Sequence, residues 1–144
     1  MKSASAIYKM LRANGTAKYE VQVVKGNTTY GVDKLKSVKV HIQLTPENGV
    51  SIGGTQATEC RLTIVEASAN WERMARFTVQ FRIRLGNTIS EWLTVGTFYT
   101  DERSEDKYGN LSIVAFDAML KTEQSWTDKI PSELLPSSYP ITAI

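Results

Sequence analysis

One histidine and one cysteine are the side chains of this sequence best suited to acid–base or nucleophilic chemistry. His41 falls on the polar side of an alternating segment, which favours a solvated position over a catalytic one. Cys60 falls on the same face of an alternating segment as Leu62 and Ile64, so we expect it to be a small buried hydrophobic residue. No second histidine or cysteine is available for a zinc site, and no local motif marks a Cys–His nucleophile. A Cys–His pair brought together by folding stays open.

Acidic side chains gather in residues 101–107, where calcium ligands or the carboxylate pair of a glycosidase are conceivable. Arg103 and Lys107 interrupt this cluster, and the spacing differs from that of an EF-hand loop. We therefore expect a solvated hairpin tip and assign no metal. The acidic residues are Asp101, Glu102, Glu105 and Asp106.

The glycine-rich residues 49–54 form neither G-x-G-x-x-G nor a Walker loop, because no Lys-Ser/Thr pair follows Gly54. We interpret them as a loop whose glycines give positive φ or a close backbone approach. A phosphate cradle is disfavoured, and no cofactor is expected.

Six basic residues would form a stripe if their strands were neighbours. The side opposite Arg76, Arg82 and Arg84 carries Phe77 and Phe81, so aromatic side chains do not alternate with the charges on one face as they do in single-strand binders. The net charge of only +2 also disfavours nucleic acid, which remains a weak alternative to a protein partner. The six residues are Lys34, Lys36, Lys39, Arg76, Arg82 and Arg84.

Length and composition fit one globular domain. The chain has 144 residues, 42% of them hydrophobic and 22% charged. No apolar run is long enough for a membrane helix, and a single cysteine cannot form an intrachain disulfide.

Strand periodicity dominates the middle of the chain. Residues 77–85 alternate apolar and polar side chains five times, and shorter alternations occupy residues 19–23, 38–44 and 60–64. Residues 99–116 predict a further hairpin. Helical spacing appears in residues 3–13, and Asp117 is placed to cap a short helix over residues 117–123.

These patterns predict a mainly β fold: a small antiparallel β-barrel or curled sheet with short helices at the N-terminus and after the last hairpin. We expect the domain to span residues 1–126. Residues 127–144 contain Pro131, Pro136 and Pro140 and predict a Pro/Ser-rich linker or tail.

Two motifs resemble a known family. Residues 96–99 read Gly-Thr-Phe-Tyr, and residues 116–121 read Phe-Asp-Ala-Met-Leu-Lys. Their order and spacing, together with Ser-Ile-Gly at residues 51–53, resemble the N-terminal barrel domain of tail-hub and baseplate-hub proteins of bacteriophages and prophages. The resemblance covers about residues 3–126.

The resemblance implies a structural role without a catalytic motif. Members of the family form a barrel, usually in a trimeric ring, that connects the tail tube to the spike or fibre and contacts other tail and baseplate proteins. They continue into further domains, so we expect a trimer in the longer assembled protein and a monomer or weak oligomer for these 144 residues. The expected location is the virion tail. A small carbohydrate- or peptide-binding β module remains the alternative, and a hydrolase that uses His41 is less favoured.

Overall fold

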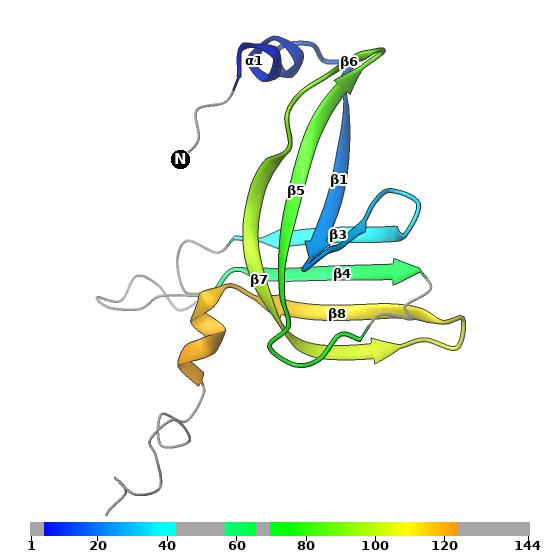
Figure 1. Ribbon diagram of the computed structural model, residues 1–144, viewed down its shortest axis with the longest axis vertical. Coiled ribbons are helices and arrows are strands. Elements are labelled where there is room, and N and C mark those ends of the chain that lie inside the picture. The colour runs from blue at the N-terminus through cyan, green and yellow to red at the C-terminus, as the bar shows by residue number, and fades with distance from the viewer. Residues whose placement is uncertain (1–4, 43–56, 66–69, 124–144) are drawn as a thin grey trace, which may run out of the picture.

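The computed structural model describes residues 5–42, 57–65 and 70–123 (Figure 1). The predicted tail at residues 127–144 and the glycine-rich residues 49–54 lie outside this part. The elements are, in chain order, α1 (Ala6–Arg12), β1 (Lys18–Lys25), β2 (Thr28–Tyr30), β3 (Leu35–His41), β4 (Glu59–Val65), β5 (Arg76–Leu85), β6 (Thr88–Ile89), β7 (Leu93–Glu105), β8 (Asn110–Phe116) and the 3-10 helix η1 (Ala118–Glu123).

All strands belong to one antiparallel sheet with the order β2-β1-β5-β7-β8-β4-β3, and β6 pairs with the end of β5. The predicted mainly β class with short helices is therefore confirmed. The sheet is open rather than closed. Of the two predicted forms, a β-barrel and a curled sheet, the structure therefore has the curled sheet.

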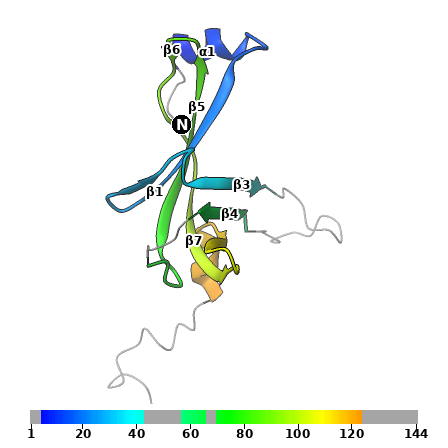
Figure 2. The same cartoon turned by 90° about the vertical axis from the view of Figure 1, so that its right-hand side faces the viewer.

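Strand β7 is the corner of this sheet. Its residues 93–99 pair with β5, and its residues 99–105 pair with β8. The register shifts between Thr100 and Glu102, and such bulges bend and twist a strand. Beyond the bend, β8, β4 and β3 run across the direction of β1 and β5 (Figures 1 and 2). One sheet thus folds over itself into two layers.

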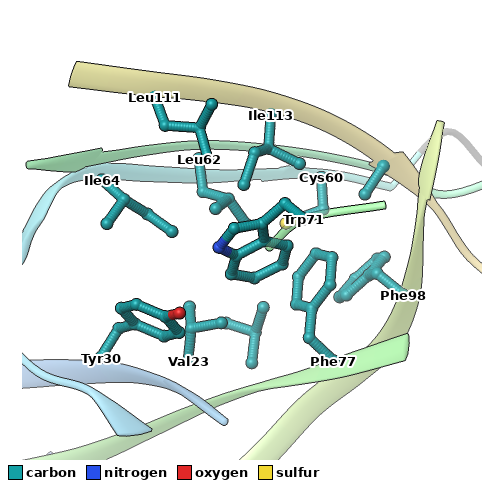
Figure 3. Close-up of a cluster of buried hydrophobic side chains, with 12 residues drawn as sticks. Val23, Tyr30, Cys60, Leu62, Ile64, Trp71, Phe77, Phe98, Leu111 and Ile113 are labelled. Carbon is teal, nitrogen blue, oxygen red and sulfur yellow. The ribbon is translucent and has the colours of Figure 1, made fainter. Parts of the chain in front are cut away.

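The core fills the space between these layers (Figure 3). Trp71 comes from the segment between β4 and β5 and has no exposed surface. Its ring centroid lies 5.6 Å from that of Tyr30 and 5.2 Å from that of Phe77. Aromatic side chains therefore connect the β1–β2 hairpin to β5. The predicted buried face of Cys60, Leu62 and Ile64 is confirmed.

The apolar face of β5 is not buried uniformly. Phe77, Val79 and Ile83 are buried, whereas Phe81 is half-buried and lies outside the main cluster. Phe81 instead packs against the rings of Tyr8 and Tyr19, at centroid distances of 6.1 and 6.3 Å. The second layer of the sheet does not reach this part of the strand.

Both helices begin with side-chain caps. The Ser5 hydroxyl accepts a hydrogen bond from the Tyr8 amide at 3.1 Å, and α1 ends at Arg12. Asp117 accepts from the Met119 amide at 2.9 Å, which confirms the predicted cap. The helix that follows is a 3-10 helix.

The predicted extent of the last hairpin tip, residues 101–107, is wrong. Asp101, Glu102 and Glu105 lie within β7, and the turn comprises only residues 106–109. The Asp106 carboxylate accepts from the amides of Tyr108 and Asn110 at 2.8 and 2.9 Å, and Gly109 has a φ of +76°. Pairing with β8 extends β7 through a segment whose charged composition is typical of a loop.

Candidate functional site

The sheet keeps the histidine and the cysteine apart. Residue His41 pairs with Glu59 and is exposed, whereas Cys60 follows Glu59 and therefore points to the opposite face. Burial raises the pKa of the Cys60 thiol to about 12, so the thiolate is disfavoured. The Cys–His pair that the sequence left open is not formed.

The acidic residues do not converge on a common point. The Asp101 carboxylate binds Arg73 at 3.2 Å. The Asp106 carboxylate accepts hydrogen bonds within the β7–β8 turn. The hydrogen bonds from Asn110 lower the pKa of Asp106. Across residues 5–42, 57–65 and 70–123, no cluster of histidine, cysteine or acidic side chains fits a metal ion.

The six basic residues divide between two distant parts of the sheet. Lys34, Lys36 and Lys39 lie in or beside β3, and the three arginines lie in β5, which is not adjacent to β3. Arg82 binds Glu20 at 2.6 Å and stacks over the Trp92 ring at 4.4 Å. A continuous basic stripe is therefore not formed.

The Gly-Thr-Phe-Tyr motif lies just before the corner of β7. The Phe98 ring folds back over Gly96, and a Cβ atom built on Gly96 would lie 2.9 Å from that ring. Phe98 is buried in the core. The motif thus places a large aromatic side chain where the two layers meet, and only glycine leaves room for it.

The second motif meets the first at the same corner. Tyr99 pairs with Phe116, and the Lys121 ammonium lies 4.2 Å from the centre of the Tyr99 ring. The side-chain hydrogen bond from Lys121 lowers the pKa of Tyr99. Asp117 also accepts from the Thr58 amide at 3.0 Å, which attaches the start of β4 to η1. These contacts describe a structural corner.

Four of the exposed apolar side chains lie on elements at the opposite end of the long strands. We define the α1 end as α1, residues 18–22 of β1, residues 81–85 of β5, β6 and residues 90–92. Figure 1 shows it far from β3, β4 and β8. Ser5 binds the Glu91 carboxylate at 2.5 and 2.8 Å, which attaches the helix to the segment after β6. The exposed residues are Ile7, Met10, Tyr19 and Ile89.

Two strand edges have no partner strand in the part of the chain that is described: the β1 edge lies at the α1 end, and the β7 edge runs from this end to the corner. Residues 93–98 of β7 pair only with β5, and residues 18–22 of β1 also pair only with β5. A hollow of about 230 Å³ lies along the β7 edge, and exposed Val95 and Ile42 contribute to its lining. Unpaired edges next to apolar side chains are typical of surfaces that bind other proteins.

Sequence patterns did not reveal all of these residues. Trp71 belongs to no periodic segment, so its central place in the core was missed. The unpaired edge of β7 was missed because alternation alone does not show that β7 leaves β5 to pair with a second strand, β8. A search for aromatic residues isolated between strands would have found Trp71.

No family model matches the chain, and neither a curated protein nor a solved structure is significantly similar to it. No helix in the described ranges is long and apolar enough to cross a membrane.

Proposed function

We propose that the protein is a structural subunit of the tail tip or baseplate of a bacteriophage or a prophage-derived tail-like particle. In this role the domain connects the tail tube to the spike or fibre. Its partners are other tail and baseplate proteins, its location is the virion tail, and the protein is not an enzyme.

The observation that carries this proposal is the contact between the two motifs on which the family resemblance rests. Gly96 and Phe98 form the inside of the corner, while Tyr99 and Lys121 interact on its outside. Residues that are far apart in the sequence thus contribute to one structural feature, as expected for a signature that specifies a fold.

The surface at the α1 end supports a role in assembly. It combines exposed apolar side chains with two unpaired strand edges, and an assembled partner would cover both. We infer that neighbouring tail proteins contact this end, whereas the β7–β8 turn at Tyr108 remains outside the contact.

Genomic neighbourhood tests the proposal quickly. We expect the gene to lie downstream of a tape-measure gene and upstream of tail-fibre or lysin genes. A neighbourhood of metabolic genes, together with turnover of a substrate that His41→Ala abolishes, would contradict it.

The competing function is a small β-type carbohydrate- or peptide-binding module. The specific observation that favours it is a hollow of about 600 Å³ beside the β1–β2 hairpin, which is large enough for a small ligand. Such a module would not assemble into particles, so the location of the protein distinguishes the two functions.

A further inference from the structure

The hollow beside the β1–β2 hairpin combines an adequate volume with charged and polar walls. It measures about 600 Å³, within the usual range of ligand pockets. Lys25 and Tyr30 line it from the hairpin, and Asn70, Glu72 and Arg76 line it from the segment that leads into β5.

Two buried polar atoms next to this hollow have no hydrogen-bond partner among the described residues. They are the Tyr30 hydroxyl and the Trp71 indole nitrogen, on side chains that are 4% and 0% exposed. Figure 3 shows these atoms on the facing sides of the two rings. A buried polar group without a partner destabilises the fold, which favours a ligand that supplies the missing partner.

Lys25 lines the hollow and lies over the Trp71 ring. Its ammonium donates to the Asn70 carbonyl and lies 4.9 Å from the centre of the Trp71 ring. A lysine stem is flexible and can move aside at small cost, since its ammonium keeps its charge and its hydration. Movement of Lys25 would uncover the face of the Trp71 ring on which the ammonium lies.

The opposite wall of the hollow is held in place. Met74 has a φ of +65°, and its amide donates to the Thr100 carbonyl at 2.6 Å. A non-glycine residue keeps this conformation only when its surroundings fix it. Glu72 and Arg76 therefore project from a backbone that the β7 corner restrains.

The chemistry of the walls defines the ligand. Lys25, Arg76 and the indole N–H are donors only, and the Tyr30 hydroxyl can also donate. Among the residues that the structure describes, Glu72 is the one acidic group that lines the hollow. We propose that this hollow binds a small hydroxylated ligand that carries an oxyanion, namely a sugar with a carboxylate or phosphate group. The oxyanion binds Lys25 and Arg76, and a ring oxygen or hydroxyl accepts from Trp71 and Tyr30.

This inference is independent of the proposed function, because a structural subunit and a separate binding module can each carry such a site. Titration calorimetry with the full chain tests it, using glucuronate and glucose 6-phosphate as ligands and using glucose and inorganic phosphate as controls. We expect both anionic sugars to bind at least about tenfold more tightly than either control.

Two variants locate the site. Arg76→Gln should weaken binding about tenfold or more, because a hydrogen-bonded charge pair is lost. Arg84→Gln on the same strand removes the same charge outside the hollow and should leave the affinity unchanged.

Tyr30→Phe separates a binding role from a structural one. Its hydroxyl has no partner in the described fold, so its removal should leave the melting temperature unchanged or higher. The affinity for the anionic sugars should nevertheless fall about fivefold or more. Equal binding of glucose or phosphate, or unchanged affinity in Arg76→Gln and Tyr30→Phe, would overturn the proposal.

Discussion

At the scale of single residues, Cys60 shows how the sheet removes a potential nucleophile from solvent. The side chain has no exposed surface, and its pKa of about 12 reflects mainly the loss of water around the thiolate. Only local or global opening exposes the sulfur.

We therefore predict that Cys60 does not react with a thiol reagent at pH 8 in the native protein and reacts fully in denaturant. Ser112 is exposed on the neighbouring strand β8, so S112C should react at once under native conditions. Rapid modification of native Cys60 would contradict its burial.

Glu20 gives a prediction about pH. The Arg82 side chain, at 2.6 Å, lowers the pKa of Glu20, and Arg84 adds a weaker contact at 3.3 Å. A lowered folded-state pKa stabilises the protein above the ordinary value of 4.5. The stabilisation is lost as the pH falls below that value and through the lowered pKa.

Glu20→Gln should reduce the free energy of unfolding at neutral pH by about 1 kcal/mol or less. The difference from the wild type should shrink as the pH falls below 4.5 and through the lowered pKa, because the wild-type carboxylate becomes protonated. Glu102→Gln, an exposed change on β7, should show no comparable pH dependence. Thermal melts at several pH values provide the measurement. A stability difference between Glu20→Gln and the wild type that grows in acid would contradict the lowered pKa of Glu20.

At the scale of elements, β5 crosses two different environments. Phe77 lies between the layers of the folded sheet, whereas Phe81 lies outside the main cluster and packs against the rings of Tyr8 and Tyr19. Two phenylalanines of the same alternating pattern therefore contribute different amounts to the stability of the fold.

Phe77→Ala should cost about 3–5 kcal/mol, as is typical of a fully buried phenylalanine. Phe81→Ala should cost about 1–2 kcal/mol, because part of its surface is already in water. Urea unfolding of both variants measures the difference. Equal losses would mean that Phe81 is covered as completely as Phe77.

Strand alternation predicted β5 and the buried face of β4 because one side of each strand packs against the core. The extent of β7 could not be predicted in this way. Glu102, Arg103 and Glu105 resemble a loop in composition, but their backbone pairs with β8 across the hairpin, and this pairing outweighs local preference. The predicted cap at Asp117 is confirmed because it depends only on neighbouring residues.

The candidate site was less predictable than the fold. The hollow forms where the β1–β2 hairpin approaches residues 70–76, two segments separated by more than one strand in the sequence. No spacing rule links Tyr30 to Trp71. Their proximity follows from the pairing of β1 with β5, which sets the β1–β2 hairpin beside the segment that leads into β5.

At the scale of the whole molecule, association depends on surfaces that the domain leaves open. The α1 end and the unpaired edges of β1 and β7 are candidates, but a stable interface buries about 1,200–2,000 Å² in total. We therefore expect the 144-residue chain to be monomeric or weakly associating in solution, and the proposed trimer to form in the assembled particle.

Light scattering over a concentration series measures this association. Met10 is exposed on α1 and Tyr108 is exposed in the β7–β8 turn. Met10→Glu should abolish any weak association, whereas Tyr108→Glu should not affect it. A trimer that is independent of concentration would show that this domain alone carries the ring contact.

The central claim is that the protein builds part of a tail, and deletion of its gene from the genome that carries it is the most direct test. Particles released after induction are examined by negative-stain electron microscopy, with the wild-type gene and the Met10→Glu variant supplied in trans. We predict particles without complete tail tips, restored by the wild-type gene and not by Met10→Glu. Infectious particles with intact tail tips in the deletion strain would contradict the claim.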